Sequence, residues 1–252
     1  MIATLAMHDH PRQQEANDRL WRAIRDHLSA TGIDAPEALT RKGDKWTNWL
    51  HKELILGHTC GLPFKQVLHS RVNYVGTFDY GLDDTDPGYY RSMIIVHADN
   101  PRQTVAEFNG SKLAYNDSDS QSGWGAPRTW ADANHLRLVP KLITGAHLKS
   151  AKAVSDGRAD IASVDTVTWR DILAYEPFAD NLRVLDITSA TPGLPLICAG
   201  RYDAAVVREA VDAAVGAMDA EVRAILGIKE VVSIPVETYL NAGRPIICAI
   251  GR

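Results

Sequence analysis

The sequence predicts an α/β protein of two lobes. Apolar strands alternate with helices along the chain, 252 residues exceed the usual size of a single core, and a hydrophobic content of 45% is enough to fill two. We expect the first lobe to hold residues 1–90 and 201–252. The second lobe, residues 91–200, is expected to be inserted into the first and to carry an anion-binding turn.

The first lobe opens with a strand and an amphipathic helix. Residues 2–7 form an apolar run typical of a buried strand, and residues 13–30 carry Leu20, Ile24 and Leu28 at helical spacing before a glycine stop. The alternation continues with an expected strand at 37–40, a helix at 45–52, and strands at 53–57 and 72–78.

A strand-to-helix turn follows the strand at 53–57. The segment His58-Thr-Cys-Gly-Leu-Pro63 offers amide groups at a helix start, the hydroxyl of Thr59 and the thiol of Cys60. Two interpretations stay open. The turn binds a ligand, facing a second turn across a cleft, or it is a tight structural turn whose polar side chains are satisfied by their neighbours.

The second lobe begins with a crossing strand at 89–98, rich in β-branched and aromatic residues, with Tyr90 near its start. We then expect short strands at 112–115, 141–144, 158–165 and 182–187, and helices at 104–108, through Trp130, and at 145–157. A return crossing at 192–200 leads into a continuous helix at 204–226 and a mixed tail at 229–252.

The most distinctive stretch runs from Ala114 to Pro127, where an apolar strand ends and a loop of hydroxyls and glycines enters a helix. Amide groups at a helix start have no partner in their own helix, so together with Ser118, Ser120 and Ser122 they form a cradle for an oxyanion. The alternative is an ordinary serine N-cap. Because glycine and proline are poor residues for a first turn, the regular helix is expected to begin only near Pro127.

A second polar group stands at a strand end. Residues 158–165 alternate small and apolar residues and end on Asp165, followed by Thr166. Ligands of open α/β sheets bind beyond the carboxyl ends of the strands, so both residues are candidates for the site.

Composition excludes several classes of partner. The chain has 27 basic and 31 acidic residues without a long basic run, which excludes nucleic acid and acidic membrane surfaces as main partners. No apolar run approaches membrane-spanning length, so no membrane insertion is expected. Residues 1–10 are too short and too soon polar for a secretory signal.

No cofactor or metal is expected. Cys60, Cys198 and Cys248 lack Cys-x-x-Cys spacing and are predicted to be small buried residues rather than disulfide, zinc or redox groups. The His8-Asp9-His10 run has no companion ligand cluster.

Three motifs together resemble the phosphate/phosphonate-type solute-binding proteins of ABC transporters. They are Ser120-Gln-Ser-Gly123 after a strand, the run from Thr144-Gly-Ala-His to Val-Asp165, and Tyr90-x-Ser-x-Ile-Ile-Val before them. The resemblance spans roughly residues 75–200. It implies a type II periplasmic-binding-protein architecture, with two crossing strands and an interlobe cleft.

The resemblance also implies site residues and partners. In that family the serine turn holds phosphoryl oxygens, a histidine at the next helix start donates to them, and an acid at the following strand end accepts hydrogen bonds. Carried over and joined to the candidates above, the ligand-binding residues are Ser120, Gln121, Ser122, Gly123, His147, Asp165, Thr166, Tyr90, Thr59 and Cys60. The implied protein is a periplasmic monomer that takes a small oxyanion to an ABC permease. Gln121 departs from the family, whose members often carry a small hydroxyl residue there, and without a recognisable leader a cytoplasmic location stays open.

Two of these residues bear on the ligand. Asp165 repels an unprotonated oxyanion, so a protonated phosphate, a phosphonate or an aminoalkylphosphonate fits better than sulfate. His147 gives pH-dependent binding if it binds as the imidazolium, and none if it only bonds the backbone at a helix start.

Two other functions are compatible with the sequence. The same scaffold resembles biosynthetic enzymes of the pyrimidine-forming and menaquinone-forming kind, in which His58, Cys60 and His147 would act as acid, base or nucleophile. A cytosolic ligand sensor is the third class. We favour the solute-binding protein, which performs no chemistry and has no catalytic residue.

Overall fold

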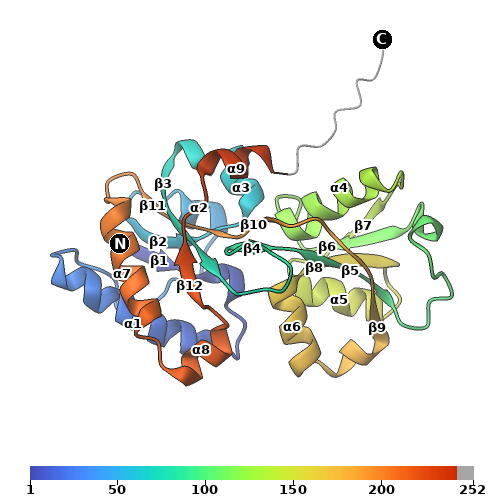
Figure 1. Cartoon of the computed structure of the whole chain (residues 1–252), viewed down its shortest axis with the longest axis horizontal. Helices are drawn as coiled ribbons and strands as arrows, with labels where there is room; N and C mark the ends of the chain where they lie inside the picture. Colours follow the sequence, from blue (N-terminus) through green and yellow to red (C-terminus); the bar gives the residue numbers. More distant parts are fainter. Residues whose placement is uncertain (243–252) are drawn as a thin grey trace, which may run out of the picture. The chain divides into compact units, whose positions relative to one another are not determined.

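The computed structural model describes residues 1–242, and the chain divides into two compact units (Figure 1). Unit 1 holds Met1–Tyr89 and Pro192–Leu240, and unit 2 is built on Tyr90–Thr191. The chain passes from one unit to the other along β4 (Tyr89–Tyr90) and returns along β10 (Thr191–Pro192), and these two short strands pair with each other.

Unit 1 contains a mixed five-stranded sheet with the order β1-β2-β11-β3-β12. The strands are β1 (Ile2–Thr4), β2 (Leu54–His58), β11 (Pro195–Ala199), β3 (Val72–Asp79) and β12 (Glu230–Val232). β1 and β2 are parallel, whereas β11 runs antiparallel to both of its neighbours. The segment expected as the return crossing at 192–200 is therefore part of the sheet of unit 1, and the return lies just before it.

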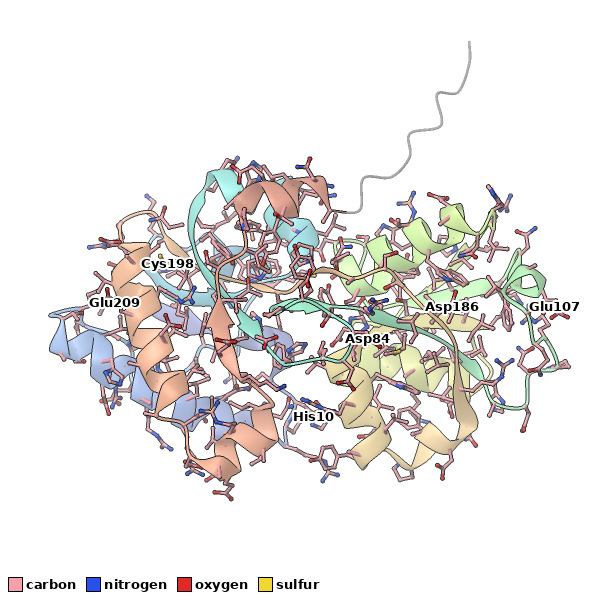
Figure 2. The ribbon with its side chains drawn as sticks, viewed as in Figure 1. His10, Asp84, Glu107, Asp186, Cys198 and Glu209 are labelled. Carbon is pink, nitrogen blue, oxygen red and sulfur yellow. The ribbon has the colours of Figure 1, made fainter. Side chains whose placement is uncertain are left out.

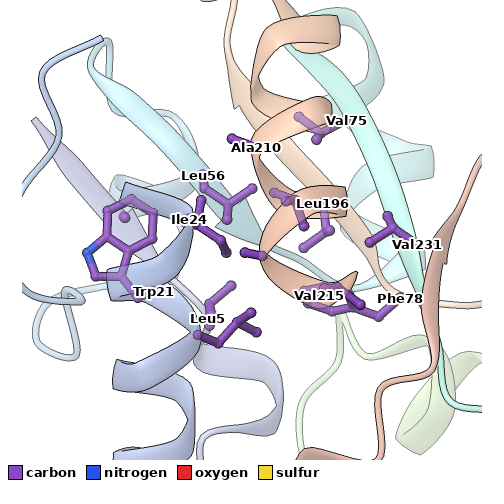
Figure 3. Close-up of a cluster of buried hydrophobic side chains, with 14 of the residues drawn as sticks. Leu5, Trp21, Ile24, Leu56, Val75, Phe78, Leu196, Ala210, Val215 and Val231 are labelled. Atoms are coloured by element: carbon purple, nitrogen blue, oxygen red, sulfur yellow. The ribbon is translucent and has the colours of Figure 1, made fainter. Parts of the chain in front are cut away.

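Helices cover both faces of this sheet. On one face lie α1 (Gln14–Ala30), α7 (Ala204–Gly216) and α8 (Ala220–Leu226), and their apolar sides bury the larger core. Figure 3 shows this core, where Trp21 and Ile24 of α1 gather with Leu56 of β2 and Leu196 of β11. The other face carries α2 (Lys45–Trp49), α3 (Gly61–Gln66) and α9 (Val236–Asn241), and between the main elements stand the short helices η1 (Ala6–His8) and η2 (Leu68–Ser70).

Two expected elements of unit 1 are wrong. Residues 37–40 form no strand, because only the Thr40 amide reaches the sheet, donating to Ala3 O at 2.7 Å. The helix expected through 204–226 is interrupted after Gly216, and α8 starts afresh where the Asp219 carboxylate accepts from the Val222 amide at 2.9 Å. The expected tail at 229–252 contains β12 and α9, and its last ten residues lie outside the described part.

Unit 2 contains a second mixed sheet with the order β7-β6-β8-β5-β9. Its strands are β7 (Val139–Ile143), β6 (Lys112–Tyr115), β8 (Ile161–Asp165), β5 (Ser92–His97) and β9 (Leu182–Ile187). β7, β6 and β8 are mutually parallel, and β5 runs antiparallel to β8 and β9. The long strand expected at 89–98 is divided into β4 and β5.

Helices also cover both faces of the second sheet. One face is buried under α5 (His147–Ser155), α6 (Thr166–Tyr175) and η5 (Pro177–Asn181). The other is buried under η3 (Val105–Phe108), η4 (Gln121–Gly125) and α4 (Ala126–Ala133). Among the side chains in Figure 2, Asp186 of β9 accepts a hydrogen bond from Trp130 Nε1 of α4 at 2.7 Å, which ties this helix to an edge strand.

Within residues 1–242, every helix falls short of the length and apolar character that crossing a bilayer requires.

Candidate functional site

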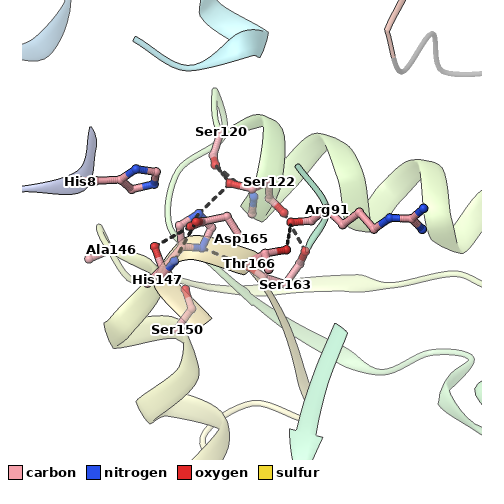
Figure 4. A network of polar contacts seen from close by, with 12 residues as sticks. His8, Arg91, Ser120, Ser122, Ala146, His147, Ser150, Ser163, Asp165 and Thr166 are labelled. Atoms are coloured by element: carbon pink, nitrogen blue, oxygen red, sulfur yellow. Dashed lines mark hydrogen bonds and ion pairs between the residues drawn. The ribbon is translucent and has the colours of Figure 1, made fainter. Parts of the chain in front are cut away.

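The parallel strands of unit 2 bring three helix starts to one edge of the sheet. β6 leads into η4, β7 leads into α5, and β8 leads directly into α6. Carboxyl ends of parallel strands share one edge, so Ser120, Ser122, Gly123, His147 and Asp165 converge there. Figure 4 shows Ser120, Ser122, His147 and Asp165. These five residues were predicted from the sequence, and the fold brings them together.

The serine turn is a helix start in π-helical register. Ser120 is the N-cap, and its Oγ accepts from the Gly123 amide at 3.0 Å. That bond occupies a lone pair of Ser120 Oγ, which also lies 3.5 Å from Ser122 Oγ, a contact in which either hydroxyl can be the donor. The amide of Ala126 donates to Gln121 O, five residues back, so the regular helix α4 begins at Ala126, close to the expected Pro127. Ser120 and Ser122 are 4% and 5% exposed.

A buried serine compensates for the proline in this helix. In the π-helical register the carbonyl of Ser122 would accept from residue 127, but Pro127 has no N–H. Instead the fully buried Ser163 hydroxyl, from β8, donates to Ser122 O at 2.7 Å. This bond fastens the serine turn to the centre of the sheet.

His147, the first residue of α5, has both ring nitrogens engaged. Nδ1 lies 3.1 Å from the carbonyl oxygen of Ser163, and Nε2 lies 2.7 Å from Ser122 Oγ. A carbonyl can only accept, so Nδ1 carries a proton, and in the neutral ring Nε2 is the acceptor. One ring thus makes the backbone contact expected of a helix-start histidine and also joins β8 to the serine turn.

Asp165 is the N-cap of α6. Its Oδ1 accepts from the Thr168 amide at 2.9 Å, and its Oδ2 accepts from the Thr168 hydroxyl at 2.6 Å. Oδ2 also lies 3.6 Å from His147 Nε2, and the whole residue is 2% exposed. A carboxylate at this distance favours the protonated imidazolium of His147.

Gly123 leaves room for two neighbouring side chains. A Cβ at this position would overlap Oδ1 of Asn116 and approach Cε1 of His147 to 3.1 Å. The sequence reasoning missed Asn116, although it directly follows β6, which is the signal that could have revealed it. Its Oδ1 is buried and has no hydrogen-bond partner among the described residues.

Three other candidates in unit 2 or at its boundary are held by the protein itself. Gln121 is 6% exposed and lies against Gly125, where a Cβ would meet its Oε1 at 3.2 Å. The hydroxyl of Thr166 donates to the carbonyl oxygen of Arg91 at 2.8 Å. Tyr90 is 3% exposed, at the point where the chain enters unit 2.

Thr59 and Cys60 belong to unit 1, at the end of β2. Thr59 is completely buried and its Oγ1 has no hydrogen-bond partner in the described chain, while Cys60 is the N-cap of α3 and 8% exposed. Beside them His58 is also buried, and desolvation, followed by the charge of His8, lowers its pKa well below the usual value. Thus the fold separates the predicted set into a cluster in unit 2 and a pair in unit 1.

Two observations concern metal ligands and thiols in the part of the chain that the structure describes. No group of three or more potential metal ligands gathers within residues 1–242. Cys198 is buried, and burial raises the pKa of its thiol to about 12, which leaves it protonated and unreactive. Cys248 lies outside the described residues.

The sequence matches one protein-family model. Residues 56–239 match the family described as ABC transporter, phosphonate, periplasmic substrate-binding protein. No curated protein matches the sequence.

Solved structures of similar fold include PhnD1 from Prochlorococcus marinus in complex with methylphosphonate. The two chains have 14% sequence identity and a TM-score of 0.73, over 95% of this chain and 93% of that one. A Xanthomonas citri protein bound to ATP has 16% identity and a TM-score of 0.69, over 92% and 90%. A binding protein component of an ABC phosphonate transporter from Pseudomonas aeruginosa has 14% identity and a TM-score of 0.63, over 92% and 80%. At such low identities these likenesses concern the fold alone, and they confirm the expected α/β class of two-lobe periplasmic binding proteins.

Proposed function

This chain belongs to the family of periplasmic substrate-binding proteins of phosphonate ABC transporters, and we propose that it captures a small phosphonate or phosphate oxyanion at the serine turn of unit 2. The captured anion is delivered to an ABC permease, and the protein performs no chemistry on it. The observation that carries the proposal is the meeting of hydroxyls, helix-start amides and one imidazole at the edge of a single sheet.

Each group has a distinct task in holding the anion. The Ser120 hydroxyl, whose oxygen is fixed by the Gly123 amide, donates its proton to one oxygen of the ligand. The amides at the start of η4 add donors and the positive end of the helix dipole. Ser122 and His147 supply a further donor on the side facing β8. Hydrogen bonds to a charged ligand contribute about 1.5–3 kcal/mol each.

A thermal-shift screen followed by calorimetry tests the proposal. Methylphosphonate, inorganic phosphate, ATP and sulfate are the ligands, and a ligand that binds only the folded state must raise its melting temperature. We expect stabilisation by methylphosphonate or phosphate above that by sulfate. No stabilisation by any phosphorus oxyanion would contradict the proposal.

A matched pair of serine variants locates the site. Ser122→Ala should weaken binding by about tenfold to a hundredfold, the value of one hydrogen bond to a charged group. Ser155→Ala, at the opposite end of α5 from His147, should bind as the wild type does. Equal affinities for the two variants would exclude the serine turn as the binding site.

A further inference from the structure

We infer that the serine turn takes up one proton together with its anion, and that Ser122 changes from a donor toward His147 to a donor toward the ligand when it does so. This inference rests on the proposed function, because it concerns how that site binds. Its residues are Ser122, His147, Ser163 and Asp165 (Figure 4).

The first step fixes the tautomer of His147. Its Nδ1 faces the carbonyl oxygen of Ser163 at 3.1 Å, and a backbone carbonyl has no proton to give. Nδ1 is therefore the protonated nitrogen in the neutral ring. The position of Ser163 in the middle of the sheet, buried completely, holds this arrangement in place.

The second step concerns the direction of the Ser122 hydroxyl. In the neutral ring Nε2 offers a lone pair 2.7 Å from Ser122 Oγ, so the hydroxyl proton points at the imidazole. Only lone pairs of Ser122 then face an incoming anion. In this state Ser122 repels an oxyanion, because two acceptors would meet, and only Ser120 and the amides of the helix start offer donors.

Protonation of His147 reverses that bond. Nε2–H then donates to Ser122 Oγ, and the hydroxyl proton is released to donate to the ligand. The proton taken up by Nε2 comes from solvent or from the ligand, and no covalent bond to the ligand forms or breaks. Protonation of His147 thus gives the anion site one positive charge and one additional donor, the Ser122 hydroxyl.

The surroundings favour the protonated ring once an anion is present. Asp165 Oδ2 lies 3.6 Å from Nε2, and the anion adds a second negative charge nearby. The other charged side chains on α5 and on the elements beside it include Asp117 and Asp119 before η4, Lys149 and Lys152 on α5, and Asp171 on α6. Two hydrogen bonds from Thr168 hold the Asp165 carboxylate in place beside His147.

The sign of the pH dependence follows from linkage. Because the anion raises the pKa of His147 in the complex above its pKa in the free protein, affinity is highest below the free-state pKa. It falls by about tenfold per pH unit between the two pKa values and levels off above the bound-state value.

Calorimetry with methylphosphonate in buffers of different ionisation enthalpy measures the protons taken up on binding. The wild type should take up close to one more proton than His147→Gln, whose amide can donate from the place of Nε2 without titrating. The ligand's own titration contributes to both proteins and cancels in the difference. His27→Gln, which removes an exposed histidine of α1, should behave as the wild type does.

A second measurement uses the wild-type protein alone, so it does not require that a variant folds. Nitrogen-15 NMR of labelled histidine should find the His147 ring neutral in the free protein at slightly alkaline pH and protonated at both nitrogens in the complex. A ring that stays neutral in the complex, or equal proton uptake by wild type and His147→Gln, would overturn the inference while leaving the proposed function standing. Absence of methylphosphonate binding to the wild type over the whole pH range would overturn both.

Discussion

The two strand-to-helix turns that supplied candidate residues differ sharply in the hydrogen bonding of their polar side chains. In unit 2, the hydroxyls of Ser120, Ser122 and Ser163 each take part in a hydrogen bond of 2.7–3.0 Å. In unit 1, Nε2 of His58 and Oγ1 of Thr59 are buried without a hydrogen-bond partner in the described chain. The first turn is a polar network, and the second is packed like a core.

Their surroundings explain the contrast. His58 lies edge-on to the rings of His8 and Phe78, at 5.7 and 5.5 Å between centroids, so ring packing surrounds it. The serine turn instead meets a carbonyl that has lost its helical donor and an imidazole whose tautomer is fixed. Two strand-to-helix turns in one protein can therefore have different functions. Substitutions in the two turns should differ in their effects on stability and anion affinity.

The largest expected effect comes from Gly123→Ala. The new Cβ would overlap Asn116 Oδ1 and press on the His147 ring, so the turn must shift. Overpacking of this kind costs about 1–3 kcal/mol of folding free energy. Anion affinity should fall by about tenfold or more because at least one donor is displaced. Chemical denaturation and titration calorimetry with methylphosphonate measure the two effects.

Gly125→Ala is the control for this substitution. Its Cβ would approach Gln121 Oε1 to 3.2 Å, which asks for a much smaller shift than the overlap with Asn116 Oδ1 at Gly123. If Gly125→Ala proved as harmful as Gly123→Ala, the loss would reflect the helix start in general rather than the contacts of Asn116 and His147.

Removal of the Ser163 hydroxyl, which bonds the serine turn from β8, and of the Thr59 hydroxyl in the turn of unit 1 should have opposite results. Ser163→Ala leaves the carbonyl of Ser122 without a donor and should destabilise the fold by about 1–3 kcal/mol. Thr59→Val removes a buried hydroxyl that has no partner, keeps the side-chain shape, and should be neutral or stabilising by up to about 1 kcal/mol. Urea denaturation of both variants gives the comparison, and a Thr59→Val protein less stable than Ser163→Ala would contradict it.

The sequence was sufficient for the parts of the site that depend on local chemistry. Ser120, Gly123 and His147 lie at helix starts that follow strands. Such positions can be predicted from the end of an apolar run and the turn residues after it. Asp165 was correctly placed at a strand end, but its bonds to Thr168 were not foreseen. An aspartate at a helix start is a typical N-cap, so the capping role of Asp165 could have been predicted from the sequence.

Contacts between distant segments could not be read in the same way. Asn116 belongs to the candidate site because its side chain lies against Gly123. The hydrogen bond from Ser163 to Ser122 joins residues 41 positions apart in the sequence. The break after Gly216 was missed because apolar residues recur at helical spacing through both α7 and α8, although Asp219 was available as a capping signal.

The smallest expected effect concerns the pH dependence of stability near His58. Burial, with a further contribution from His8, lowers the pKa of His58 well below its unfolded value of about 6.5, so below that pH the unfolded chain binds a proton that the folded chain does not. Stability is therefore complete above pH 6.5 and is lost as the pH falls, by at most about 1.4 kcal/mol per pH unit. His58→Phe, which keeps a ring against Phe78, should flatten this slope in urea denaturation series between pH 7.5 and 5. His27→Gln, on the exposed face of α1, should leave it unchanged, and an unaltered slope in His58→Phe would mean that other groups cause the loss.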